Sequence, residues 1–130
     1  MADTNATFFA PQLYIPDGVN DISFYKDAFG AEELRRWTND DGTIHVAELV
    51  IDGAVFLLHQ ATPEKRRHAP GPAGTTVVVG IFVPDVDKVM NDAGKAGATI
   101  ISPAKSYEYG YRQGEVADPF GHHWLIQTKI

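Results

Sequence analysis

The chain repeats itself at an almost constant spacing, and this repetition restricts the folds open to it more than any single motif does. Three landmarks in the sequence have counterparts 68 positions later and a fourth has one after 67, and the order of the four is kept. The four matches are Pro16-Asp17 with Pro84-Asp85, Gly30-Ala31 with Gly97-Ala98, Gly53 with Gly121, and Leu57-Leu58 with Leu125-Ile126. Self-similarity at a fixed period indicates duplicated structural units. We therefore predict one domain over 1–130, with modules at 7–60 and 76–129 and a linker at 61–75.

Hydrophobic periodicity and turn residues predict the order βαβββ in each module. The predicted helices cover Asp21–Phe29 and Asp85–Ala96. The predicted strands are Phe8–Ile15, Glu33–Thr38, Ile44–Ile51, Ala54–Gln60, Thr76–Val83, Ala98–Pro103, Tyr111–Ala117 and His122–Lys129. We expect Thr76–Val83 to be a central strand, because it is almost wholly apolar, and Lys105–Tyr109 to be a polar connection. The predicted fold is α+β, with two curved mixed sheets that form a cavity and helices outside.

Composition limits the partners and the location of the protein. Hydrophobic residues make up 44% of the chain and there is no cysteine, which excludes disulfides and thiolate metal sites. No apolar run approaches the roughly 18 residues that a membrane helix needs, and the first residues lack the features of a signal peptide. The net charge of −6 argues against nucleic acid as a partner. We expect a cytoplasmic protein without a membrane partner.

Three stretches of the sequence resemble the vicinal-oxygen-chelate superfamily, also called the glyoxalase, bleomycin-resistance and dioxygenase group. They are Ile22–Ala31 (ISFYKDAFGA), Asp52–Leu57 (DGAVFL) and Val116–Trp124 (VADPFGHHW). The Asp-Pro-Phe-Gly-His-x-Trp form, with Tyr111-Arg112-x-Gly114 before it, resembles the PhnB-like branch. The resemblance implies either a metal-dependent lyase, isomerase or dioxygenase, or a metal-free protein that sequesters small molecules. It also implies pairing of modules within one chain or across two, and we expect a homodimer.

Enzymes of this superfamily hold a divalent metal with His or Glu residues on the first and last strands of both modules. The resemblance places these ligand positions at Ala10, Leu57, Val78 and Leu125 in this chain. None of these side chains has a donor atom for a metal. The sequence therefore predicts no metal and no cofactor at the site of the enzymes.

Alternation of side chains along strands predicts which residues line the cavity instead. If Leu125 faces the cavity, Trp124 and Ile126 face the helices and belong to the core. The predicted ligand-binding residues are Trp37, Val55, Leu57, His59, Tyr109, Tyr111, Arg112, His123, Leu125 and Gln127. Arg112 has an alternative role as an ion-pair partner of Glu115 or Glu108. The tyrosines at 107, 109 and 111 share one parity, so they form either a stacking surface or an interface.

Two functions from different classes remain open on the sequence. The first is a metal-free protein that binds an apolar or aromatic small molecule between its modules. The second is an enzyme, with a displaced metal held by His59, His123 and Glu48, or with one of the two histidines acting as an acid–base catalyst. The absence of donor atoms at Leu57 and Leu125 favours binding.

Overall fold

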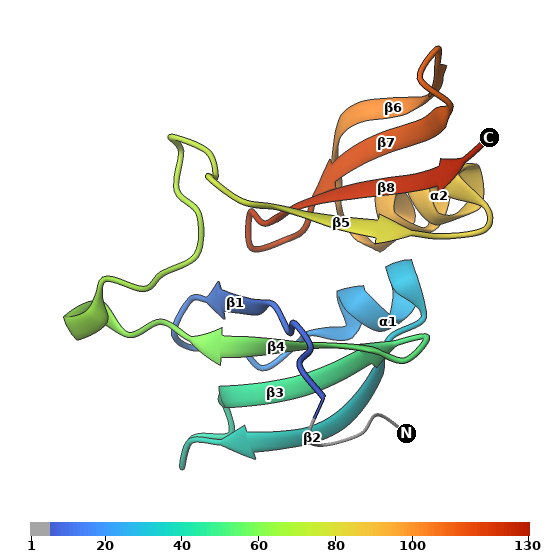
Figure 1. The fold of residues 1–130 in the computed structure, drawn as a ribbon. Helices are drawn as coiled ribbons and strands as arrows, with labels where there is room; N and C mark the ends of the chain where they lie inside the picture. Colours follow the sequence, from blue (N-terminus) through green and yellow to red (C-terminus); the bar gives the residue numbers. More distant parts are fainter. Residues whose placement is uncertain (1–5) are drawn as a thin grey trace.

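The computed structural model describes residues 6–130, which form two four-stranded sheets, each with one helix (Figure 1). The first module comprises β1 (Gln12–Ile15), α1 (Ser23–Phe29), β2 (Glu32–Thr38), β3 (Ile44–Ile51) and β4 (Ala54–Gln60). The second comprises β5 (Val78–Phe82), α2 (Val86–Ala96), β6 (Thr99–Tyr107), β7 (Tyr111–Ala117) and β8 (His123–Lys129). The linker between them contains a short 3₁₀ turn, η1 (Pro63–Lys65). Within residues 6–130, no helix has the length and apolar character needed to cross a membrane.

The strand orders are β1-β4-β3-β2 and β5-β8-β7-β6, so both modules have the same topology. In each sheet the first strand pairs in parallel with the last, and the other pairs are antiparallel. Gln12 pairs with Leu57 in the first module, and Gly80 pairs with Leu125 in the second, so both partners are shifted by the same 68 positions. The prediction of an α+β fold made of two tandem βαβββ modules is confirmed.

Both helices begin within two residues of their predicted starts. Asp85 caps α2, because its carboxylate accepts a hydrogen bond from the Lys88 backbone N–H at 3.1 Å. In the first module, the Asp21 carboxylate instead bonds to Ser23, at 3.0 Å from its backbone nitrogen and 2.7 Å from its hydroxyl. This local turn holds residue 21 outside α1. Both helices end at a glycine with positive φ, as the sequence indicates.

Three strand predictions differ from the structure. The segment predicted as a central strand is the edge strand β5, which pairs only with β8. Its apolar residues are not buried on both faces, since Val78 is 45% exposed and Phe82 is 57% exposed. The predicted polar connection was wrong at 105–107, because these residues continue β6 by pairing with β7. β1 begins at Gln12 and not at Phe8.

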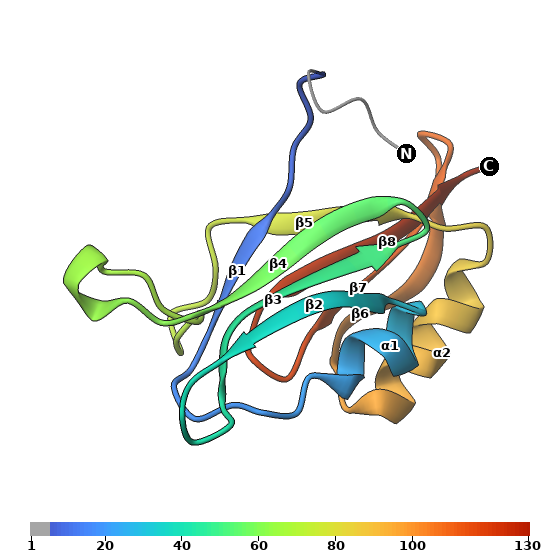
Figure 2. The same cartoon turned by 90° about the horizontal axis from the view of Figure 1, so that it is seen from below.

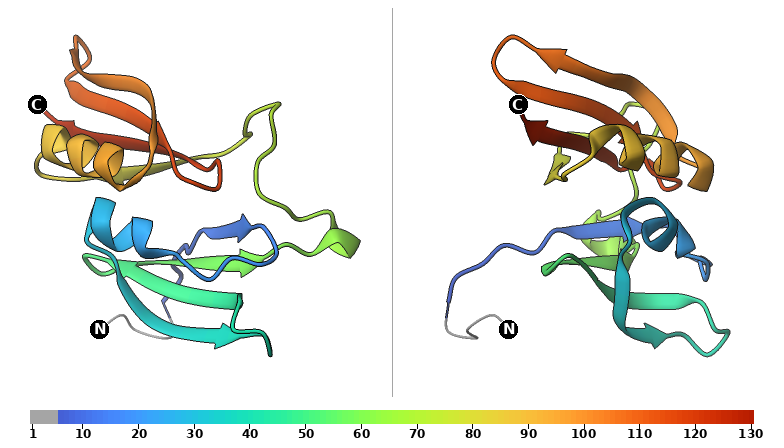
Figure 3. Two further views of the ribbon diagram at one scale, coloured as in Figure 1. Left: turned by 180° about the vertical axis from the view of Figure 1, so that it is seen from behind. Right: turned by 90° about the vertical axis from the view of Figure 1, so that its right-hand side faces the viewer.

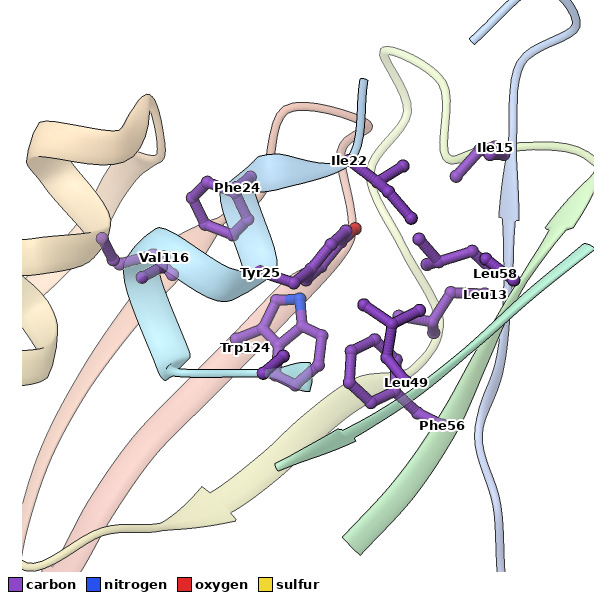
Figure 4. Packing of buried hydrophobic residues seen from close by; sticks show 14 of the residues in the cluster. Leu13, Ile15, Ile22, Phe24, Tyr25, Leu49, Phe56, Leu58, Val116 and Trp124 are labelled. Carbon is purple, nitrogen blue, oxygen red and sulfur yellow. The ribbon is translucent and has the colours of Figure 1, made fainter. Parts of the chain in front are cut away.

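A shared hydrophobic core joins the modules, and α1 lies at its centre. The Tyr25 ring on α1 lies 5.5 Å from the Phe56 ring on β4 and 6.0 Å from the Trp124 ring on β8 (Figure 4). The two helices pack beside each other on one side of the molecule (Figures 2 and 3). Trp124 and Ile126 are buried, as predicted. The helix-facing sides of the two sheets therefore contribute to one core, whereas the opposite sides carry more exposed residues.

Candidate functional site

Each sheet has a face that points away from the helices, and we call these the first and second open faces. Residues paired directly across neighbouring strands share a face, and residues on one strand alternate between faces. By this rule the first open face includes Gln12, Tyr14, Trp37, Val46, Glu48, Val55, Leu57 and His59. The second includes Val78, Gly80, Phe82, Tyr111, Gln113, Glu115, His123, Leu125 and Gln127. Eight of the ten predicted ligand-binding residues lie on these faces. A ninth, Tyr109, lies at the edge of the second face, next to Tyr107 and Tyr111.

The first open face has a leucine at its centre with polar neighbours on both sides, and a histidine and a tyrosine toward one end. Leu57 lies in the middle of β4, between Gln12 on β1 and Glu48 on β3. The His59 ring is 5.1 Å from the Tyr14 ring, and the nitrogen Nδ1 of His59 lies 2.7 Å from the backbone oxygen of the next residue. Trp37 is 46% exposed at the β2 edge. This face therefore combines aliphatic and aromatic side chains with the Gln12 amide and the Arg35–Glu48 ion pair.

The second open face combines Leu125 with a chain of amides. Gln127 is only 8% exposed, and its side-chain oxygen accepts a hydrogen bond of 2.8 Å from the Gln113 amide nitrogen. Gln113 in turn bonds to the Tyr109 hydroxyl. A Cβ atom on Gly80 would lie 3.1 Å from the Gln127 nitrogen. The glycine on β5 therefore leaves room for the Gln127 amide on this face.

Aromatic rings cluster at one end of the second open face. The rings of Tyr107 and Tyr109 stack with centroids 5.2 Å apart, and Tyr109 and Tyr111 are 5.8 Å apart. Phe82 on β5 adds a further ring, 5.9 Å from Tyr111. Tyr107 and Tyr109 are stacked, whereas Tyr109 and Tyr111 are tilted by 48°, so the stacking alternative describes part of this cluster. Phe82 was missed because its strand was assigned to the interior of the sheet.

Arg112 does not join the other predicted residues. Its guanidinium binds the carboxylate of Asp87 at the start of α2, with nitrogen–oxygen distances of 2.7 and 3.0 Å. Its partner is thus Asp87 and neither Glu108 nor Glu115. The hydrogen bond from Arg112 lowers the pKa of Asp87 below its usual value. This ion pair connects α2 to β7 on the side of the sheet that faces the helices.

The Asp118 carboxylate holds the two modules together from beneath the open faces. It is 4% exposed and accepts hydrogen bonds from the Tyr25 hydroxyl at 2.6 Å and from the Trp124 indole nitrogen at 3.0 Å. The backbone N–H groups of Phe120 and His122 donate to its other oxygen, each at 3.0 Å. Burial, and then the nearby Asp118 charge, raise the pKa of Tyr25 well above 10.0. The aspartate of the Asp-Pro-Phe-Gly motif therefore connects the two modules by hydrogen bonds.

His122 adds a second polar contact between the modules. Its Nε2 lies 2.7 Å from the backbone oxygen of Tyr14 on β1. The neighbouring His123 bonds instead to Glu115 on β7, with 2.8 Å between Nδ1 and the carboxylate oxygen. The two adjacent histidines therefore serve different partners, as expected for successive residues at the start of a strand.

The described residues do not fit a divalent metal centre. Within residues 6–130, no three His, Asp or Glu side chains come together in a way that could hold a metal ion. One chain thus does not assemble the alternative set of His59, His123 and Glu48. The strand neighbours of Leu57 and Leu125 are Gln12 and Gly80, two places beyond the predicted Ala10 and Val78. With this register the four positions are Gln12, Leu57, Gly80 and Leu125. The Gln12 amide is the one polar side chain among them.

A cavity in the described part of the chain lies away from the predicted ligand-binding residues. It measures about 860 Å³ and lies between the edges of β1 and β5, with the linker at its side. None of the ten predicted residues lines it; its walls include Phe9, Pro11, Tyr14, Pro70, Val78 and His122. The cavity reaches the first open face at Gln12 and Tyr14 and the second at Val78 and Gly80, but it does not include Leu57 or Leu125.

These features define a class of protein with two βαβββ modules, each with one open sheet face. The sequence model of the Glyoxalase/Bleomycin resistance protein/Dioxygenase superfamily matches residues 11–126. The chain belongs to this superfamily.

Relatives and solved structures agree with this assignment. An uncharacterized protein of Mycobacterium bovis is 38% identical over 125 residues, which is 93% of this chain and 82% of that protein. TioX from Micromonospora sp. ML1 has a TM-score of 0.68 at 25% identity, covering 95% of this chain and 97% of that one. The fosfomycin resistance protein FosX from Listeria monocytogenes superposes with a TM-score of 0.71, at 14% identity and with 96% and 94% coverage. At that identity the likeness to FosX shows the fold alone.

Proposed function

We propose that this chain is a metal-free binding protein, which holds an apolar or aromatic small molecule between a first and a second open face. The observation that carries the proposal is the pair Leu57 and Leu125, which occupies the centres of the two faces. A divalent ion at these positions would exchange hydration water for hydrocarbon, which is strongly unfavourable. An apolar ligand would instead gain about 25 cal/mol for each Å² of apolar surface removed from water.

We further propose that two copies of the chain complete the cavities. The first open face of one copy would cover the second open face of the other, which gives two equivalent sites related by a two-fold axis. Large apolar side chains remain exposed on both faces of a single chain, including Trp37, Val78 and Phe82. These exposed apolar side chains are the surface that the second copy would cover.

The same proposal assigns the chain to the PhnB-like branch and to the cytoplasm. Support for the branch comes from Asp-Pro-Phe-Gly-His-His-Trp at 118–124 and from Tyr111-Arg112 upstream. The net charge of −6 disfavours nucleic acid as a partner. The absence of cysteine is compatible with a reducing compartment.

Titration with the fluorescent aromatic probe anilinonaphthalenesulfonate tests the proposal. We expect saturable binding to the folded protein, with roughly tenfold weaker affinity for Leu125→Glu, because a carboxylate would be buried against the probe without a partner. The exposed helix variant Asn91→Asp adds the same charge away from the faces and should bind as the wild type does. Equal affinity of the wild type and Leu125→Glu would contradict the proposed site.

A crystal structure with Ni²⁺, Zn²⁺ or Mn²⁺ tests the metal-free part of the proposal. We expect no ion between the open faces. An ion held by His, Glu or Asp ligands at about 2.0–2.3 Å between the modules would overturn the proposal and favour a metal-dependent lyase, isomerase or dioxygenase.

A further inference from the structure

The pair Glu115 and His123 stands apart from the other polar groups of the second open face. Glu115 on β7 lies 2.8 Å from Nδ1 of His123 on β8, and the two side chains are 24% and 23% exposed. Each of the five histidines lies in the described part of the chain, and His123 is the one paired with a carboxylate. The others bond to backbone oxygens or, in the case of His45, to the Gln60 side chain.

We propose that His123 is a general base, and that Glu115 positions it, for metal-free proton transfer from an apolar or aromatic carbon acid. This inference rests on the proposed function, since the carbon acid would occupy the same ligand cavity.

The hydrogen bond to Glu115 determines which nitrogen of His123 can accept a proton. An ionised carboxylate only accepts hydrogen bonds, so it requires the proton of the neutral imidazole to be on Nδ1. The lone pair is then on Nε2, which has no hydrogen-bond partner among residues 6–130. When Nε2 takes a proton, the Glu115 carboxylate stabilises the positive charge of the imidazolium ion.

The surroundings of His123 suit a base that acts on an apolar ligand. Its neighbours across the sheet are Val78 on β5 and Ala117 on β7, and Leu125 follows on the same face. Hydrocarbon on these sides limits the water that would otherwise solvate Nε2. A half-buried imidazole with an orienting carboxylate is the usual arrangement for general-base catalysis.

The chemistry needs no oxidant, metal or second substrate. Nε2 removes a proton from a carbon beside a carbonyl, the C–H electron pair forms the carbon–carbon double bond of an enolate, and the carbonyl oxygen takes the negative charge. Return of the proton from Nε2 to a carbon atom restores the neutral imidazole. The net reaction class is an isomerisation of an unsaturated apolar carbon acid, in which the proton returns to another carbon of the conjugated enolate on the same side.

Elimination of nitrobenzisoxazole tests the base directly, because this planar aromatic probe reacts when a base removes its ring C–H proton. The electron pair of that bond forms a nitrile, the N–O bond breaks, and a coloured cyanonitrophenolate is released. We expect the wild type to accelerate the elimination, and His123→Gln to lower kcat/KM by about a hundredfold, at the low end of general-base contributions. His68→Gln removes an exposed imidazole in the linker and should retain the wild-type rate.

Glu115→Gln provides a second test that does not depend on loss of the imidazole. NMR of the imidazole nitrogens should show a proton on Nδ1 of His123 in the wild type and a mixture of tautomers in Glu115→Gln, with a several-fold lower kcat. A wild type that binds the probe but eliminates it no faster than His123→Gln would overturn the base and leave the binding function intact. Absence of probe binding would overturn both proposals.

Discussion

At the scale of single residues, Asp118 begins the Asp-Pro-Phe-Gly turn and also accepts hydrogen bonds from both modules. Its carboxylate receives two side-chain and two backbone hydrogen bonds while almost fully buried. Two of the four donors belong to aromatic side chains of the core, and one of these, Tyr25, comes from the other module. A buried carboxylate is tolerated here because donors surround both of its oxygens.

Replacement of Asp118 by asparagine should destabilise the protein by about 2–3 kcal/mol. The amide NH₂ group would face donors where an oxygen now accepts, so buried donors would lose their partner. Urea unfolding measures this change, and Asp27→Asn on the exposed side of α1 is the matched control. The control should lie within about 0.5 kcal/mol of the wild type. A similar, small effect for both variants would show that the Asp118 contacts contribute little.

The raised pKa of Tyr25 predicts that stability falls in alkaline solution. Below its usual value of 10.0, Tyr25 keeps its proton in both the folded and the unfolded chain. As the pH rises above this value, the unfolded chain releases the proton first, because burial and Asp118 raise the pKa in the folded state. Stability is therefore lost with rising pH. Urea midpoints between about pH 9 and pH 11 should fall more steeply for the wild type than for Tyr25→Phe.

At the scale of elements, the contact between α2 and β7 depends on the absence of a side chain. A Cβ atom on Gly114 would lie 2.6 Å from the sulfur of Met90, which is itself buried on α2. The helix packs against the sheet at this point. By contrast, a Cβ atom on Gly94, within α2, would meet Ile100 at an ordinary 3.7 Å.

The same substitution should therefore have opposite effects at these two glycines. Gly114→Ala should destabilise the protein by about 1–3 kcal/mol through overpacking. Gly94→Ala should stabilise it by about 0.5–1 kcal/mol, because alanine restricts the unfolded chain and favours the helix. Thermal and urea unfolding of both variants provide the measurement. Gly114→Ala with wild-type stability would mean that Met90 moves aside without loss of packing.

At the scale of the whole molecule, the orientation of the modules explains why the predicted site is not closed within one chain. The shared core occupies the helix-facing sides of both sheets, and α1 lies between β4 and β8. The two open faces are left with half-exposed apolar side chains. A second copy of the chain is the partner that we propose for these surfaces.

Light scattering at micromolar concentration should give twice the chain mass of 14.2 kDa. The double variant Leu57→Glu/Leu125→Glu should shift the mass toward that of a single chain, because it places like charges on both faces that meet in the dimer. Asn91→Asp, on exposed helix surface, should remain dimeric. A wild type that scatters as a single chain would contradict the proposed assembly.

Periodicity and turn chemistry were sufficient for most of the fold. β3, β4 and β7 match their predicted bounds, and the burial of Trp124 and Ile126 follows from alternation alone. The order of strands within a sheet was less predictable. Residues 76–83 have the composition of an interior strand, yet β5 is an edge strand. Val79 and Ile81 on one of its faces pack against the core, whereas Val78 and Phe82 on the other face are apolar but exposed.

The sequence by itself determined the duplicated βαβββ modules, the superfamily likeness and the missing metal donors at Leu57 and Leu125. These features depend on local spacing and on the chemistry of single side chains. Only the tertiary structure decided which distant groups meet: Tyr25 with Asp118, Arg112 with Asp87, and Glu115 with His123. Alternation along a strand determines on which face of the sheet a side chain lies. Its hydrogen-bond partner depends on how strands, helices and modules pack in three dimensions.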